Sequence, residues 1–177
     1  MPMIVKIFIT LLILVSICET GFCKDQKIPV MIVIDEKLPL NIESRAYQEL
    51  AEFLKQNGFD LIVFPQEKKN DLCSLISGIM ENNSQSLSQI AKDKGALFLI
   101  CGKLQTMTTG TTIVYDATLN EVEIFGEIKL IFLNKPDIPL NVKLKEKGLS
   151  VHLQESYQQA LGKALEGFER SIIDRIK

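Results

Sequence analysis

The chain has 177 residues, of which 46% are hydrophobic, and its 20 Lys and Arg residues against 22 Asp and Glu give a formal net charge of −2. This balance leaves no basic surface of the kind that binds nucleic acid, so direct DNA or RNA binding is excluded as an expected function. No internal repeat or low-complexity linker divides the chain, and its length is sufficient to bury one hydrophobic core.

An apolar segment opens the chain. The run IFITLLILVSIC follows a single charge, Lys6, and has the length of the hydrophobic region of a secretory signal peptide rather than of a membrane helix. We therefore predict a signal peptide over residues 1–23 and a single domain over residues 24–177. Two alternatives stay open, namely an uncleaved amino-terminal anchor and a lipoprotein lipidated at Cys18 or Cys23. The expected location is exported, either periplasmic or associated with the outer membrane.

The first part of the domain alternates strands and helices. The apolar periodicity predicts strands over residues 28–34, 59–64 and 96–102 and helices over residues 46–57, 68–81 and 84–95. Asp35 to Pro39 should end the first strand, and Asn41 or Ser44 should cap the helix that follows. A strand, a helix and a strand in this order make a crossover unit, so the first two strands should be parallel.

The second part of the domain reads as sheet followed by one helix. The stretch Gln105–Thr112 is uncharged and contains five Thr residues, so it is predicted as a Thr-rich loop, either a strand end or a hairpin tip. Residues 121–133 and 140–145 alternate apolar and polar side chains, which predicts an antiparallel hairpin with a bulge at Gly126. Residues 150–177 carry an apolar helical stripe that should cover the sheet. The expected fold class is α/β (α+β), with a mixed sheet, a parallel start, an antiparallel hairpin and a long carboxy-terminal helix.

No catalytic or metal-binding group stands out, and the chain is predicted to be neither an enzyme nor dependent on a cofactor. The single histidine, His152, precedes the last helix and has no GxSxG motif to accompany it, although a hydrolase using it stays open. Cys73 and Cys101 form a disulfide or are two separate buried thiols, and the second interpretation is favoured. No cysteine spacing suits a metal.

Two groups of residues are candidate binding sites. Asp35 and Glu36 follow a buried strand, where open sheets often bind ligands, so a small-ligand or cation site at this sheet edge is the alternative function. The Thr-rich loop and the solvent-exposed polar face of the hairpin offer hydroxyls, carboxylates and backbone hydrogen-bonding groups to a partner protein. The predicted interaction residues are Thr106, Thr108, Thr109, Thr111, Glu121 and Glu123.

The order of elements resembles a known group of envelope proteins. The helix end and strand Ile90-Ala91…Gly95-Ala96…Cys101-Gly102, followed by a hairpin and by Ala160 and Ala164 in the last helix, resemble the periplasmic domain of curli-assembly and penicillin-binding-protein-activator lipoproteins. The amino-terminal domain of the Tol-system propeller protein is similar in a more distant way. The resemblance covers Ile28 to Ile176. It implies a non-enzymatic assembly or regulatory module that binds other envelope proteins. The expected partners of this chain are such envelope proteins, with a homo-oligomer as a further alternative.

Overall fold

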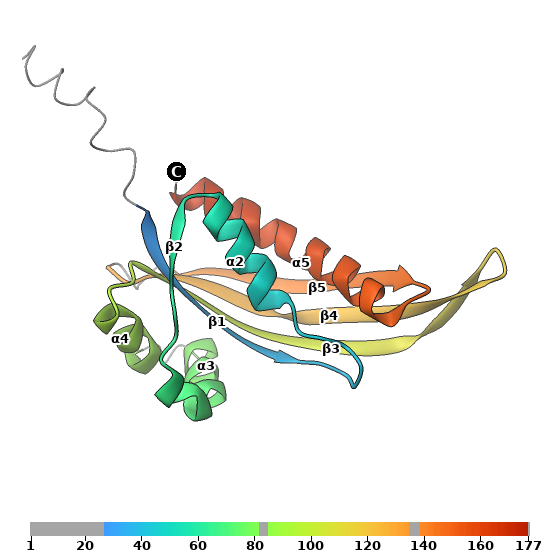
Figure 1. Cartoon of the computed structure of the whole chain (residues 1–177), viewed down its shortest axis with the longest axis horizontal. Helices are drawn as coiled ribbons and strands as arrows, with labels where there is room; N and C mark the ends of the chain where they lie inside the picture. The colour runs from blue at the N-terminus through green and yellow to red at the C-terminus, as the bar shows by residue number, and fades with distance from the viewer. Residues whose placement is uncertain (1–26, 82–84, 135–138, 177) are drawn as a thin grey trace, which may run out of the picture.

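One mixed sheet with the strand order β2-β1-β3-β4-β5 organises the described residues (Figure 1). The computed structural model describes residues 27–81, 85–134 and 139–176. The strands are β1 (Ile28–Lys37), β2 (Phe59–Ile62), β3 (Phe98–Val114), β4 (Ala117–Phe132) and β5 (Leu140–Ser150). β1 pairs in parallel with both β2 and β3, whereas β4 pairs antiparallel with both β3 and β5. The predicted mixed sheet is confirmed.

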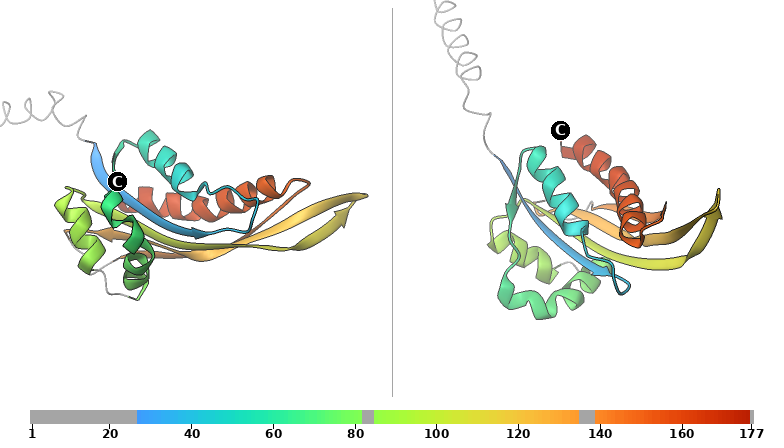
Figure 2. Two further views of the ribbon diagram at one scale, coloured as in Figure 1. Left: turned by 60° about the horizontal axis from the view of Figure 1, so that its bottom comes forward. Right: turned by 45° about the vertical axis from the view of Figure 1, so that its right-hand side comes forward.

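Helices cover both faces of the sheet. Helices α2 (Ala46–Gln56) and α5 (Leu153–Ile176) lie on one face, and α3 (Leu72–Met80) and α4 (Gln85–Asp93) lie on the other (Figure 2). A short 3₁₀ helix over Gln66–Asp71 precedes α3. Because successive strand residues point to opposite faces, β1 must be apolar at every position between these layers. Val30 and Ile32 enter the core beneath α2 and α5, while Met31 and Val33 enter the core beneath α3 and α4.

The crossover from β1 through α2 to β2 is confirmed, with two corrections. β1 does not end at Asp35 but continues to Lys37, because Glu36 and Lys37 remain in register with Leu104 and Gln105 of β3. Neither Asn41 nor Ser44 caps α2, since the N-cap residue is Arg45 and makes no side-chain capping bond. The predicted end of α2 is confirmed, because Gly58 adopts a φ of +85° directly after the helix.

The long carboxy-terminal helix α5 packs along β4 and β5 as predicted. Its buried stripe includes Tyr157, Leu161, Leu165 and Phe168. The start of α5 lies so close to β5 that a Cβ at Gly148 would overlap the carbonyl oxygen of Ser156. Only glycine leaves room at this crossing, so Gly148 sets how closely the helix approaches the sheet.

The Thr-rich stretch is the outer end of a strand, which is one of the two forms predicted for it, and it is not an unpaired loop. Residues 106–114 continue β3 and pair with β4, and the turn of this hairpin lies at Tyr115 and Asp116, which have φ values of 48° and 65°. Two positive φ values are typical of a type I′ turn, which follows the twist of paired strands. The bulge also lies elsewhere than predicted, because the register shifts between Thr108 and Gly110, while Gly126 stays in register with Leu104. Glycine is needed at position 126 because a Cβ there would overlap the carbonyl oxygen of Lys103.

Candidate functional site

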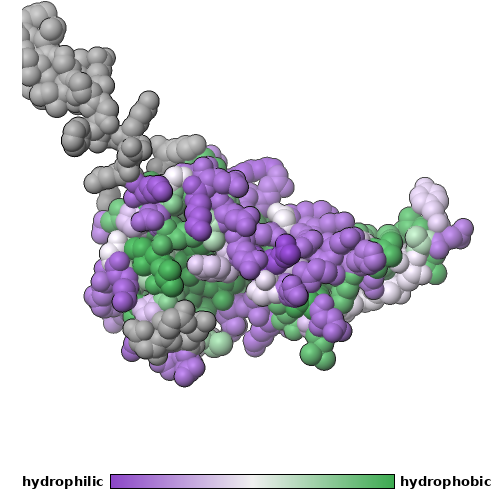
Figure 3. All heavy atoms as spheres, in the orientation of Figure 1, coloured by the Kyte–Doolittle hydropathy of each residue, from purple (hydrophilic) through white to green (hydrophobic). Residues whose placement is uncertain are grey.

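The end of the β3–β4 hairpin projects beyond the helices (Figure 1). Its tip is apolar: Ile113 is 74% exposed and Tyr115 is 99% exposed. No charged residue occurs between Lys103 and Asp116. In Figure 3, apolar residues are visible in this projecting part, away from the main body. Large apolar side chains held together in water are a common mark of an interaction surface.

The four predicted threonines lie along this hairpin in different environments. Thr108, Thr109 and Thr111 are exposed. Thr109 lies at the bulge, where its hydroxyl donates a 3.4 Å hydrogen bond to the backbone oxygen of Glu121. Thr106 is only 4% exposed, and its hydroxyl has no hydrogen-bond partner in the described part of the chain. The prediction that Thr106 offers its hydroxyl to a partner therefore disagrees with the burial of this residue, which pairs with Ile124 on β4.

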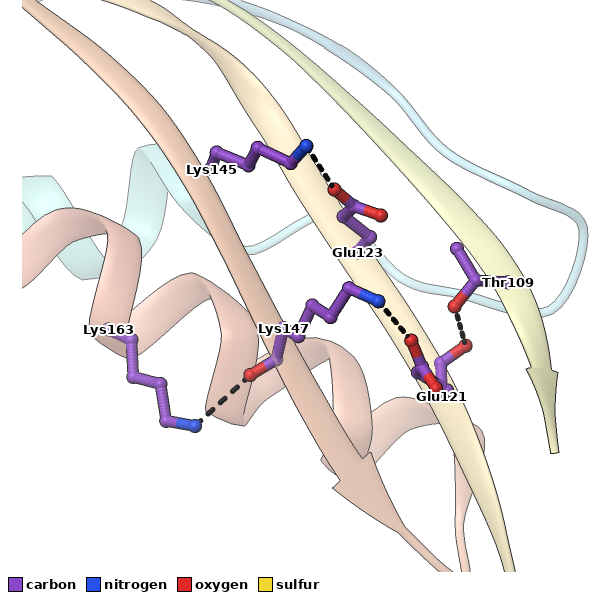
Figure 4. Close-up of polar contacts among 6 residues, drawn as sticks. All are labelled: Thr109, Glu121, Glu123, Lys145, Lys147 and Lys163. Carbon is purple, nitrogen blue, oxygen red and sulfur yellow. Dashed lines mark hydrogen bonds and ion pairs between the residues drawn. The ribbon is translucent and has the colours of Figure 1, made fainter. Parts of the chain in front are cut away.

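Glu121 and Glu123 belong to a ladder of ion pairs between β4 and β5 (Figure 4). The ammonium of Lys147 donates a 2.5 Å hydrogen bond to the carboxylate of Glu121, and Lys145 lies 3.4 Å from the carboxylate of Glu123. The Lys147 ammonium lowers the pKa of Glu121, and the Glu121 carboxylate raises the pKa of Lys147. Both glutamates lie on the sheet face away from α5, because the alternating residues Val122 and Ile124 enter the core beneath that helix. Their side chains are only 22% and 14% exposed, and each has a lysine beside it.

Asp35 and Glu36 do not converge on one site. They are consecutive residues inside β1, so their side chains point to opposite faces of the sheet. The carboxylate of Glu36 accepts hydrogen bonds from the hydroxyls of Tyr157, at 2.5 Å, and Ser44, at 2.6 Å. It thereby joins β1 to α5 and to the segment before α2. Across residues 27–81, 85–134 and 139–176, no group of three or more His, Cys, Asp or Glu side chains could hold a metal ion.

The remaining reactive side chains lie apart from one another. His152 is exposed just before α5, and its backbone oxygen accepts a hydrogen bond from the Ser156 N–H. Cys73 and Cys101 are both free thiols, as favoured from the sequence, but Cys73 is exposed rather than buried. Burial raises the pKa of the Cys101 thiol to about 12, so this thiol is protonated at neutral pH.

A hollow lies beside β2, where that strand ends before its neighbour. β2 stops at Ile62 while β1 continues to Lys37, so one edge of β1 is left open there. The hollow has a volume of about 510 Å³ and its lining contains no charged side chain. Apolar atoms gather around β2 in Figure 3. Its lining residues include Ile34, Tyr47, Val63, Phe64 and Leu72.

A second hollow, which the sequence interpretation missed, lies on the sheet face away from α5. It has a volume of about 500 Å³ and lies over Phe125 of β4, with Met80 at the end of α3 beside it. Its other lining residues include Lys37, Lys103, Lys143, Lys145 and Glu127. Only the alternation of Lys143, Lys145 and Lys147 along β5 signals this site in the sequence, and that pattern is equally typical of a solvated strand face.

No family model matches the chain, and no curated protein sequence matches it. Solved structures do match at low sequence identity. The putative neuraminyllactose-binding hemagglutinin homolog from Helicobacter pylori is 11% identical, and the match covers 87% of this chain and 87% of that one with a TM-score of 0.44. Lipoprotein GNA1162 from Neisseria meningitidis is 12% identical over 83% of this chain and 99% of that one, with a TM-score of 0.38.

The LpoB C-terminal domain from Salmonella enterica is also similar to this chain. It is 10% identical, and the match covers 74% of this chain and 90% of that domain with a TM-score of 0.34. A lipoprotein and the LpoB domain are therefore among the structural neighbours of this chain. The similarity is too distant to transfer any residue's role to this chain.

Proposed function

We propose that this protein is a non-enzymatic interaction module of the cell envelope that binds a partner protein through the end of its β3–β4 hairpin. The observation that carries the proposal is the projecting tip, where Ile113 and Tyr115 are held in water by paired strands. Exposed apolar side chains gain free energy when a partner removes them from water, by roughly 25 cal/mol for each Å² buried. Because the ribbon is already paired, little conformational entropy is lost on binding.

The backbone of the hairpin supports the same role. β1 pairs with β3 only as far as Gln105, so the outer edge of β3 has no neighbouring strand from Thr106 to Val114 within the described residues. An open strand edge can accept a strand from another chain. The exposed hydroxyls of Thr108, Thr109 and Thr111 add polar contacts around the apolar tip. Glu121 and Glu123 lie beside this surface as part of its charged border.

The proposal includes export. We propose a signal peptide over residues 1–23, with lipidation of Cys18 or Cys23 as an alternative, and these residues lie outside the described part of the chain. The domain over residues 24–177 is proposed to act in the periplasm or at the outer membrane. Within the described residues, no helix combines the length and apolar character needed to cross a bilayer. The partner is another envelope protein or a second copy of this chain.

Crosslinking in intact cells tests the hairpin. The double variant Ile113→Ser/Tyr115→Ser should lose the crosslinked species that the unaltered protein forms. Leu40→Ser is the matched control, because Leu40 is 89% exposed but lies outside the hairpin, and it should retain that species. All three proteins should have the same melting temperature, since these side chains contribute little to the folded state. Retention of the same crosslinked species by the double variant would contradict the proposal.

A further inference from the structure

The hollow over Phe125 is built from two adjacent rows of side chains that cross the sheet. In one row Asp35, Lys103, Glu127 and Lys143 lie in register on β1, β3, β4 and β5, although Asp35 does not line the hollow itself. In the next row Lys37, Gln105, Phe125 and Lys145 lie in register on β1, β3, β4 and β5. Because these positions share the face away from α5, four lysines and one aromatic residue line the same hollow. Residues far apart in the chain thus form one lined cavity of about 500 Å³.

The lining is strongly positive although the whole chain is slightly acidic. Its charged side chains are four lysines and one glutamate, Glu127, whereas the formal net charge of the chain is −2. Glu127 is itself paired, because its carboxylate lies 3.5 Å from the ammonium of Lys129. The local charge is therefore complementary to an anion.

Two of the four ammonium groups are already engaged. Lys103 donates a 3.4 Å hydrogen bond to the hydroxyl of Ser77 on α3, and Lys145 is paired with Glu123. By contrast, Lys37 and Lys143 are exposed and form no hydrogen bond or ion pair with any other described residue. These two lysines come from β1 and β5, on opposite sides of Phe125, and they are the ammonium groups most available to a ligand.

The donors and acceptors of the lining define the class of ligand. The lining offers the N–H donors of four lysines, the amide of Gln105, the carboxylate of Glu127 and the apolar surfaces of Phe125 and Met80, so charged N–H donors predominate among its polar groups. A peptide strand needs donors and acceptors in equal number, whereas a carboxylate or phosphate accepts only. A volume of this size is typical of sites for small molecules.

We propose that this cavity binds a small organic anion: a carboxylate or phosphate held by Lys37 and Lys143, with an apolar chain or ring lying on Phe125 and Met80. The proposal does not depend on the partner bound by the hairpin. The ligand is a free small molecule and not the surface of an anionic membrane.

Titration calorimetry tests this site with decyl phosphate below its critical micelle concentration. Decyl phosphate should bind. Decanol should not bind because it lacks the phosphate, and inorganic phosphate should bind at least about tenfold more weakly than decyl phosphate because it lacks the apolar chain. The variant Lys37→Gln/Lys143→Gln should weaken binding of decyl phosphate by at least about tenfold. The control Lys55→Gln/Lys92→Gln makes the same change of charge on α2 and α4 and should bind as the unaltered protein does.

Three results would overturn the proposal. Equal binding of decyl phosphate by the two double variants would show that Lys37 and Lys143 do not hold the anion. Equal affinity for inorganic phosphate and decyl phosphate would show that Phe125 and Met80 do not bind the apolar chain of the ligand. Binding to vesicles of anionic phospholipid without binding to decyl phosphate would assign the surface to a membrane instead of a small molecule.

Discussion

The hydroxyl of Tyr157 donates a 2.5 Å hydrogen bond to the carboxylate of Glu36, which joins the last helix to the first strand. Tyr157 is fully buried, and its oxygen also accepts a hydrogen bond from the Arg45 N–H at the start of α2. Burial, together with the bond to Glu36, raises the pKa of Tyr157, so the phenol remains a donor across the physiological range. Three elements therefore share one polar junction.

Removing that hydroxyl should destabilise the fold. Tyr157→Phe leaves the Glu36 carboxylate with one donor fewer, and we expect a loss of about 1–3 kcal/mol in the free energy of unfolding. Urea denaturation measures the change. Tyr47→Phe is the control, because Tyr47 is on the exposed face of α2 and should leave the unfolding midpoint unchanged. An unchanged midpoint for Tyr157→Phe would show that the junction contributes nothing to stability.

Two glutamates between α2 and α5 should make stability depend on pH. Burial raises the pKa of Glu49 and of Glu169. A carboxyl with a raised folded-state pKa favours folding when protonated, so its contribution falls as the pH rises above the unfolded value of about 4.5. We expect Glu49→Gln to raise the melting temperature at pH 7 and to have no effect below pH 4.

The size of that effect should be modest, a few tenths of a kcal/mol, because both carboxylates are partly in water. Scanning calorimetry at the two pH values provides the measurement. Glu146→Gln, at an exposed position on β5, should change the melting temperature little at either pH. A lower melting temperature for Glu49→Gln at pH 7 would contradict the assignment.

The two described cysteines should differ in reactivity. Iodoacetamide should modify Cys73 in the folded protein and leave Cys101 unmodified, because Cys73 is exposed while the thiol of Cys101 is buried with a pKa of about 12. Peptide mass spectrometry after digestion distinguishes the two sites. In denaturant both should react, which serves as the control. Rapid modification of Cys101 without denaturant would mean that the core around it opens readily.

Two glycines provide a matched pair of substitutions. Gly148→Ala should destabilise the protein by about 1–3 kcal/mol, because the added methyl overlaps the carbonyl oxygen of Ser156. Gly162→Ala should stabilise it by up to about 1 kcal/mol, because Gly162 lies within α5 with nothing near its missing Cβ and alanine favours the helix. Chemical denaturation of both variants measures the difference. A stabilising Gly148→Ala would refute the close crossing of β5 and α5.

The fold class was predictable because its signals are local. The apolar run of β1, the helix end at Gly58 and the stripe of α5 each depend on a few neighbouring residues. The length of β1 was not predictable, because Glu36 and Lys37 stay in the sheet through pairing with Leu104 and Gln105 of β3. The full length of β3 was not predictable for the same reason, since pairing with β4 keeps the polar Thr-rich segment within the strand.

The binding surfaces depend even more on register. Asp35 and Glu36 are adjacent in sequence but point to opposite faces, whereas Lys37 and Lys143 share one face although they are far apart along the chain. A one-residue change of register would send either lysine to the other side of the sheet. The sequence shows which side chains are charged, but the pairing between distant strands determines which of them lie together on one face of the sheet.

The parallel pairing of β1 with β3 also determines when the fold can be completed. Met31 pairs with Leu99, and most of the first half of the domain lies between them, whereas β3, β4 and β5 are joined by short connections. Contacts between nearby residues close at a smaller cost in chain entropy and generally form sooner. We therefore expect the β3–β4–β5 meander to form first and β1 to dock last. Until then, the apolar residues of β1 stay exposed to chaperones and to aggregation.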